Sequence, residues 1–137
     1  LGDFERVDVL INCGGVVSTV PFQEVTDAEW DRTLRINLTG TFTTCSAIYP
    51  YFIEKKGGRI VNVSSVAGKI GGGLLGTAAY ATSKAGVNGL TKAIAMIPLG
   101  RAADPSEPAQ MILFFASDAA SFVNGEIGDC DGGIVLD

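Results

Sequence analysis

Short apolar runs alternate with longer segments of helical periodicity along the chain. The runs Val7–Asn12 and Arg59–Ser65 are rich in valine and isoleucine and end at polar or glycine residues, which predicts two buried strands. Between them, apolar residues recur every four positions and predict a helix: Trp30, Leu34, Leu38 and Phe42. The capping box Thr26–Glu29 marks the start of this helix, which is expected to continue to about Lys55. A helix between two such strands predicts a right-handed parallel crossover, and therefore an α/β fold.

The second half of the chain predicts two further helices and a last strand. The glycine-rich segment Lys69–Gly76 lacks the Gly-Lys-Ser/Thr ending of a phosphate-binding P-loop, so we interpret it as a flexible connection to a helix over Gly76–Ala95. Asp104 as a cap, followed by proline and glutamate, predicts another helix that ends near Asp118. The segment Glu126–Asp131 is expected to begin a final strand and tail.

The junction between Ala95 and Met96 has no helix-ending signal. No glycine, asparagine or proline follows directly, although the helical pattern stops there and a doubly wound fold needs another strand at about this point. We therefore expect a segment to be missing between these two positions. Residues 1–137 are interpreted as one incomplete domain.

Composition restricts the protein class. A hydrophobic content of 47% and a mean hydropathy of +0.32 fit buried parallel strands, since the longest apolar run, Met111–Ala116, is too short to cross a bilayer. The opening residues LGDFERVD do not resemble a signal peptide, which predicts a cytoplasmic protein without a membrane partner. A net charge of −5 and no cluster of basic residues argue against nucleic acid as a partner.

Cysteine and histidine usage restricts the chemistry. Three cysteines, Cys13, Cys45 and Cys130, show no metal-binding spacing and are odd in number, so we expect buried free thiols in a reducing cytoplasm and no metal. The chain contains no histidine, which excludes a Ser-His-Asp triad within it and any His-containing zinc site. Acid–base chemistry must therefore use tyrosine, lysine or carboxylates.

The pair Tyr80 and Lys84 is the first candidate for that chemistry. A spacing of four residues in a helix places both side chains on one face, where an ammonium favours the ionised form of a phenol and helps it to exchange a proton with a reacting oxygen. Taken alone, this spacing is far more typical of an aromatic residue beside a solvated lysine than of a catalytic pair.

Other polar residues cluster at the predicted carboxyl ends of the strands, where open α/β sheets bind ligands. Asn12 begins the turn after the first strand, and Ser64 and Ser65 end the second, although these serines could simply cap or turn the chain. Asn37 lies in an apolar stretch, so its amide must be hydrogen-bonded, either to neighbouring backbone or to a water.

Several motifs in a fixed order resemble the short-chain dehydrogenase/reductase superfamily, classical type, and within it 3-oxoacyl-(acyl carrier protein) reductases and related alcohol dehydrogenases. They are INCGG at Ile11–Gly15, INLTG at Ile36–Gly40, IVNVSS at Ile60–Ser65, YATSK at Tyr80–Lys84, and the tail from IPLGR through FFASD to CDGG. The resemblance implies a three-layer, Rossmann-like, doubly wound parallel sheet. The sheet would be incomplete here, because the N-terminal glycine-rich βαβ unit and a later strand with its Pro-Gly substrate loop are absent.

The resemblance also implies roles for individual residues. Tyr80 would be the general acid or base for a carbonyl and a secondary alcohol, and Lys84 would assist it and bind the nicotinamide ribose. Ser65, with Ser64 as second choice, would hydrogen-bond the substrate oxygen, and Asn37 would hold a water of a proton relay. NAD or NADP would be the cofactor, and its contacts would come from Asn12, Gly14, Gly15, Tyr80 and Lys84.

Departures from the family pattern leave alternatives open. Asn-Cys-Gly-Gly at Asn12–Gly15 replaces the usual Asn-Asn-Ala-Gly, and the Ser65-to-Tyr80 spacing is slightly long. A chain that truly lacks the absent segments is expected to bind the dinucleotide poorly and to be inactive. A non-catalytic dinucleotide-sensing or assembly module, or a hydrolase with a Ser65–Lys84 dyad, are the other interpretations. The resemblance further suggests a homotetramer or homodimer formed through the helices Asp27–Lys55 and Gly76–Ala95.

Overall fold

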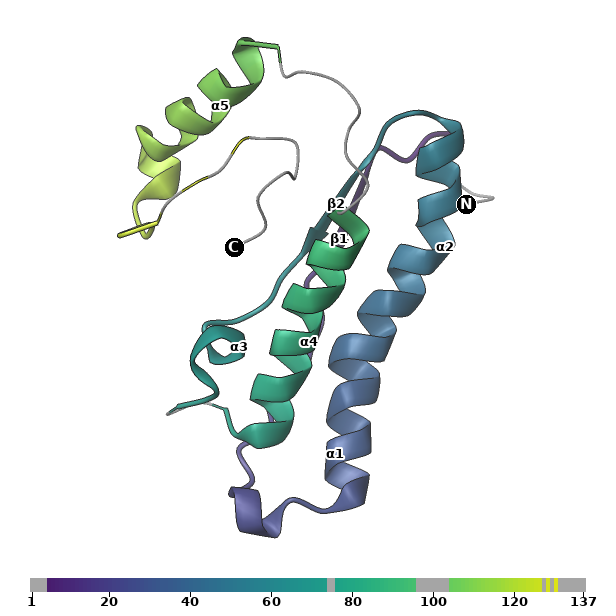
Figure 1. Ribbon diagram of the computed structural model, residues 1–137, viewed down its shortest axis with the longest axis vertical. Helices are drawn as coiled ribbons and strands as arrows, with labels where there is room; N and C mark the ends of the chain where they lie inside the picture. The colour runs from purple at the N-terminus through teal and green to yellow at the C-terminus, as the bar shows by residue number, and fades with distance from the viewer. Residues whose placement is uncertain (1–4, 74–75, 96–103, 127, 129, 131–137) are drawn as a thin grey trace. The chain divides into compact units, whose positions relative to one another are not determined.

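The computed structural model describes residues 5–73, 76–95, 104–126, 128 and 130, which fall into two compact units, residues 1–91 and 92–137. The first unit contains a two-stranded parallel sheet of β1 (Val9–Asn12) and β2 (Arg59–Asn62), whose register pairs Val9 with Arg59 and Asn12 with Asn62 (Figure 1). Both predicted strands are therefore present, with bounds shorter than the apolar runs. Their parallel pairing confirms a parallel crossover, while its right-handed sense stays a prediction.

A continuous helical rod connects the two strands (Figure 1). It consists of α1 (Asp27–Leu34), a π-helical turn η2 (Arg35–Thr39) and α2 (Gly40–Glu54), and it follows a short 3₁₀ turn at Phe22–Glu24. The Thr26 hydroxyl caps the rod by accepting a hydrogen bond from the Glu29 amide at 3.2 Å. The predicted start and length of this helix are thus correct, whereas its π-helical turn was not foreseen.

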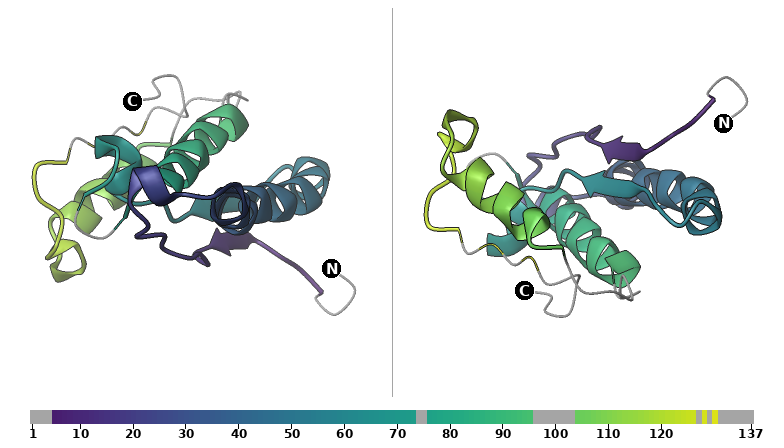
Figure 2. Two further views of the ribbon diagram at one scale, coloured as in Figure 1. Left: turned by 90° about the horizontal axis from the view of Figure 1, so that it is seen from below. Right: turned by 90° about the horizontal axis from the view of Figure 1, so that it is seen from above.

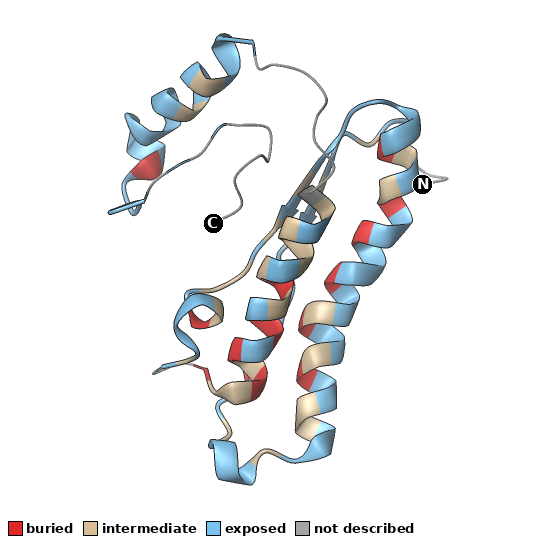
Figure 3. Cartoon of the chain, viewed as in Figure 1, coloured by how far each residue is buried: buried red, intermediate tan, exposed pale blue. Residues whose placement is uncertain are grey.

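Buried residues follow one side of this rod (Figure 3), and in its first half they are polar. Its buried residues are Thr33, Asn37, Thr41, Cys45, Ile48 and Phe52. In contrast, Trp30, Leu34 and Leu38 are half-buried, and Phe42 is 54% exposed. The apolar row used to predict the helix therefore runs beside the buried row.

The helix α4 (Ala78–Ala95) lies beside the rod, as the views along the helices also show (Figure 2). Glycine permits this close approach, because a Cβ added at Gly86 would lie 2.7 Å from Cδ2 of Leu38. The short helix α3 (Ala67–Ile70) packs against α4 in the same way, since a Cβ at Gly68 would lie 2.7 Å from the carbonyl carbon of Lys84. Glycine at these two positions thus sets the spacing around α4.

The second unit contains α5 (Ser106–Phe115) and a 3₁₀ turn at Asp118–Ala120. Asp104 precedes α5 as expected: its carboxylate accepts from the Ser106 amide at 2.9 Å, and its own amide donates to the Glu107 carboxylate at 2.8 Å. The helix ends at Phe115, before the predicted Asp118. Met96 and most of the strand expected from Glu126 lie outside the described residues.

No helix within the described ranges combines the length and the apolar content needed to span a bilayer.

Candidate active site

Side-chain hydrogen bonds link the carboxyl ends of the two strands to both neighbouring helices. Asn12 on β1 donates to Oδ1 of Asn62 on β2 at 2.9 Å and accepts from the Thr44 hydroxyl of α2 at 2.8 Å. Asn62 in turn donates to the Thr91 hydroxyl of α4 at 3.0 Å. The Asn12 amide, which we predicted to contact the cofactor, therefore bonds to protein groups of the sheet and α2.

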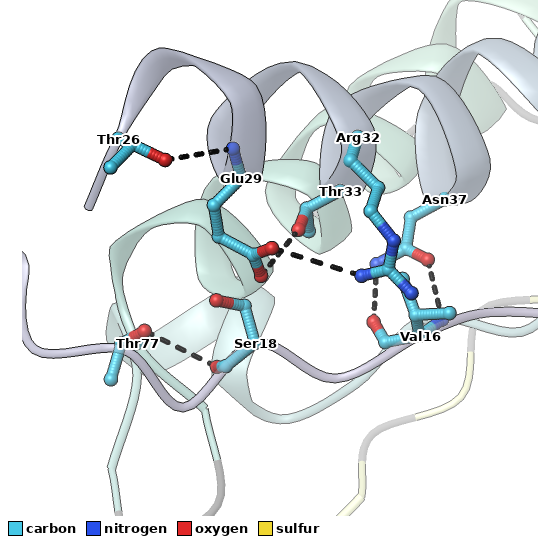
Figure 4. Close-up of polar contacts among 8 residues, drawn as sticks. All are labelled: Val16, Ser18, Thr26, Glu29, Arg32, Thr33, Asn37 and Thr77. Carbon is cyan, nitrogen blue, oxygen red and sulfur yellow. Dashed lines mark hydrogen bonds and ion pairs between the residues drawn. The ribbon is translucent and has the colours of Figure 1, made fainter.

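Asn37, in the π-helical turn, holds the main chain of the loop after β1. Its Oδ1 accepts from the Val16 amide and its Nδ2 donates to the Val16 carbonyl, both at 2.8 Å (Figure 4). The second Nδ2 proton is donated to the Ser83 hydroxyl of α4 at 2.9 Å, and the residue is 1% exposed. Of the two predicted partners of this amide, neighbouring backbone is the one present, while the water relay stays a prediction.

The same loop also contacts the start of α4. The Ser18 carbonyl accepts from both the amide of Thr77, at 3.0 Å, and its hydroxyl, at 3.2 Å. Thr77 directly precedes α4, and its carbonyl accepts from the Ala81 amide at 2.9 Å. The loop is therefore attached to the rod through Val16 and to α4 through Ser18 (Figure 4).

Lys84 carries a buried ammonium next to this loop. The residue is 5% exposed, and its Nζ donates to the Val63 carbonyl, beyond the end of β2, at 2.9 Å. A Cβ placed on Gly15 would lie 3.6 Å from this nitrogen and 3.1 Å from Oδ1 of Asn37. No carboxylate among the described residues forms an ion pair with Lys84. One of its three N–H donors is thus used by the backbone.

Tyr80 lies one turn before Lys84 on α4. The Lys84 Nζ is 6.0 Å from the centroid of the Tyr80 ring, as expected for side chains four residues apart in a helix. The ring packs closely on Gly76, where an added Cβ would approach its Cδ1 to 2.4 Å. Gly76 thus leaves the space that the ring occupies.

The two adjacent serines after β2 have different partners. The Ser64 hydroxyl donates to the Lys84 carbonyl at 2.9 Å, which ties the strand end to α4. The Ser65 oxygen accepts from the Ala67 amide at 3.2 Å, and its proton has no acceptor within the described part of the chain. Ser65 is therefore the serine whose hydroxyl proton has no acceptor among the described residues, and its contact with the substrate oxygen stays a prediction.

The glycines after β1 differ in their surroundings. Gly14 is exposed, and a Cβ there would meet nothing within 4 Å, whereas Gly15 faces Asn37 and Lys84. Sequence reasoning missed two further residues of this region, Ser83 and the main chain of Val16. Ser83 lies inside the YATSK motif, and a hydroxyl three residues after Tyr80 was the only available signal.

Cys45 is a buried thiol beside the asparagines at the strand ends. Burial raises the pKa of the Cys45 thiol above that of a free cysteine, although hydrogen bonds with Asn62 and Asn12 partly oppose this effect. Cys13 and Cys130 are exposed, so the expectation of buried thiols is correct for Cys45 and wrong for these two. The residues described include no group of three or more side chains able to hold a metal ion.

Thiol labelling is expected to separate these cysteines. Near neutral pH, iodoacetamide should modify Cys13 and Cys130 rapidly and Cys45 slowly, because Cys45 is shielded and less ionised. Since the pKa of Cys45 is higher in the folded state than in the unfolded chain, its burial should also weaken folding as pH rises above the free-thiol value. Peptide mapping against time would measure the three rates, and equal rates would contradict this placement of Cys45.

Comparisons with known proteins match this arrangement to one family. Residues 1–97 match the family model described as short chain dehydrogenase, and residues 93–135 match the model described as enoyl-(acyl carrier protein) reductase. The chain is 35% identical to the 3-oxoacyl-[acyl-carrier-protein] reductase of Thermotoga maritima, over 97% of this chain and 68% of that protein. It is 34% identical to the D-threitol dehydrogenase of Mycolicibacterium smegmatis, over 98% of this chain and 65% of that protein.

A solved structure gives the same result for the fold. A short chain dehydrogenase from Mycobacterium smegmatis superposes with a TM-score of 0.62 at 38% identity, covering 88% of this chain and 57% of that one. The alignments to the two curated relatives run over 169 and 171 positions, so each relative has residues inside the aligned region without a counterpart among the 137 residues here. The chain spans about two thirds of their length. It belongs to the short-chain dehydrogenase/reductase superfamily, a family of oxidoreductases, and its fold is an incomplete Rossmann-like α/β fold.

Proposed function

We propose that this chain forms part of an NAD(P)-dependent oxidoreductase that interconverts a carbonyl and a secondary alcohol by hydride transfer. The observation that carries the proposal is the buried Lys84 ammonium, which lies one turn from Tyr80 and forms no ion pair with a described carboxylate. A buried lysine without a carboxylate partner is uncommon, and here it lies beside a phenol and a strand end. Such an arrangement is typical of a proton-transfer site.

The residues present fit the nicotinamide-ribose part of the cofactor. Lys84 has three N–H donors, of which the Val63 carbonyl takes one, so two can bond to ribose hydroxyls. At Gly14 the backbone is exposed and nothing lies within 4 Å of an added Cβ, so the adenosine part of the cofactor could approach it there. When bound, the nicotinamide would supply or accept the hydride. The selection of NAD or NADP stays open in this proposal.

In carbonyl reduction, the Tyr80 hydroxyl would donate a proton to the developing alkoxide, and Lys84 would stabilise the phenolate left behind. Ser65, whose hydroxyl proton is not donated within the described residues, would donate a hydrogen bond to the same substrate oxygen. In alcohol oxidation the proton would move in the opposite direction. Asn37 would contribute mainly by fixing the loop at Val16. It would also hold a water of the proton relay that passes through Lys84.

We further propose that the chain lacks an internal segment of its relatives between Ala95 and Met96. The alignments that exceed the length of this chain support this proposal. They also support our treatment of residues 1–137 as one incomplete domain. In the relatives, a segment at this position is expected to supply a strand and part of the substrate site, so the substrate is assigned here only as a carbonyl or a secondary alcohol.

Self-association is part of the same proposal. Ile36, Phe42 and Ile53 expose apolar surface on the rod, and Ala85 and Gly89 present small exposed residues on α4. Such surfaces favour a homodimer or homotetramer through these helices. The free cysteines are compatible with the reducing cytoplasm that we propose as its location.

Mixing the full-length protein, which includes the segments absent from these 137 residues, with NADH or NADPH and a panel of ketones and 3-oxoacyl thioesters tests the proposed function. Loss of the reduced-cofactor absorbance that depends on the carbonyl is the expected result. Cofactor binding without turnover on any carbonyl would instead favour the non-catalytic module. Release of acid from an activated ester without cofactor, abolished by Ser65→Ala, would favour the hydrolase.

A further inference from the structure

Two hydroxyl side chains of α4 accept a hydrogen bond from the side-chain amide of an asparagine that lies on another element. Ser83 accepts from Nδ2 of Asn37 at 2.9 Å, and Thr91 accepts from Nδ2 of Asn62 at 3.0 Å. Each hydroxyl also donates a hydrogen bond to a carbonyl of α4. Ser83 donates to the Tyr80 carbonyl and Thr91 to the Val87 carbonyl, both at 2.7 Å. The two contacts are chemically alike, but only the first is adjacent to Lys84.

Ser83 and the Val16 main chain require the same orientation of the Asn37 amide. A serine hydroxyl has one proton, and that proton is already donated to the Tyr80 carbonyl. Its oxygen can therefore only accept at the contact with Asn37, so the Nδ2 end of the amide must face it. This orientation leaves Oδ1 free to accept from the Val16 amide.

The orientation of this amide matters because Val16 directly follows Gly15. Both polar groups of the Val16 main chain are bonded to Asn37, so the preceding backbone is held beside the Lys84 ammonium. Ser83 is completely buried, and its hydroxyl bonds on both sides to protein groups. A fully bonded, buried polar network of this kind restricts its members to one arrangement.

We propose that Ser83 is a positioning residue, which locks the Asn37 amide in the orientation that the Val16 main chain also requires and thereby holds the Gly15–Val16 backbone against the Lys84 ammonium. The effect on turnover rests on the proposed function, whereas the effect on the Val16 main chain does not. Ser83 itself contacts none of the reacting atoms.

The test compares Ser83→Ala with Thr91→Val, since each variant removes one hydroxyl that accepts from an asparagine amide. Ser83→Ala is expected to speed hydrogen exchange of the Val16 amide by about tenfold and to lower kcat by about tenfold with little change in substrate KM. Thr91→Val should change neither quantity, although both variants lose stability. Ser83→Cys, which keeps the volume but bonds more weakly, should fall between Ser83→Ala and the parent chain.

Equal effects of Ser83→Ala and Thr91→Val on Val16 exchange and on kcat would overturn the proposal, because they would show only a general loss of stability. If the chain has no turnover with any carbonyl, the proposed function fails. The exchange rate of the Val16 amide still decides the role of Ser83 in that case. Unchanged Val16 exchange in Ser83→Ala would then overturn it.

Discussion

Replacing Tyr80 by phenylalanine is expected to lower kcat by at least about a hundredfold, the lower end of what a general acid contributes. The substitution removes only the hydroxyl, so the ring can keep its packing on Gly76. The free energy of unfolding should therefore change by less than about 1 kcal/mol. Lys84 would keep its bond to the Val63 carbonyl but would have no phenolate to stabilise.

Tyr49→Phe provides a matched control, because it makes the same chemical change on α2 instead of α4. The Tyr49 hydroxyl is buried and has no hydrogen-bond partner among the described residues, so its removal should leave kcat unchanged and should not lower stability. Steady-state rates with reduced cofactor, together with urea denaturation of each variant, would measure both effects. Equal kcat values for Tyr80→Phe and the parent chain would remove Tyr80 from the proposed mechanism.

Asn37→Ala is expected to lower the free energy of unfolding by about 3 kcal/mol, because several buried polar groups lose partners at once. The amide and carbonyl of Val16 and the oxygen of Ser83 all bond to this one side chain. Turnover should fall as well, since the loop beside Lys84 would lose its attachment to the rod. Urea denaturation followed by circular dichroism would give the change in stability.

Asn88→Ala is the corresponding control on α4. Asn88 is half-buried, and no side-chain hydrogen bond to it is found among the described residues, so the substitution should change stability by less than about 1 kcal/mol. If Asn37→Ala proved equally mild, the bonds to Val16 would contribute little to folding. The loop after β1 would then be held mainly by contacts other than those with Asn37.

The order of elements could be predicted from the sequence because periodicity and capping act locally. Thr26 begins the rod as expected, and both strands lie within the predicted runs. Which side of the rod is buried depends instead on the elements that pack against it, and these are distant in the sequence. Thr33 and Thr41 are buried while Phe42 is exposed, which a rule that places apolar residues inside cannot anticipate.

The candidate site was predictable as a set of residues but not as a set of contacts. Tyr80 and Lys84 follow from helical spacing, and the serines follow from their place after a strand. The bonding of Ser64 to the Lys84 carbonyl depends on how closely α4 approaches the strand end, and no sequence pattern encodes that distance. The same limit applies to Ser83, because its proposed role depends on a hydrogen bond from Asn37, which lies on the rod.

The polar row on the rod has a consequence for how the helices can align. An apolar seam tolerates a shift of one helix along its neighbour, since one aliphatic contact resembles the next. Here Asn37 bonds to Ser83 in a fixed direction, so sliding the rod by a turn against α4 would break that bond and leave its buried groups unpaired. The two helices therefore have a single axial alignment, and a lengthening of either helix between its attachment points should be tolerated far less than a change at its exposed surface.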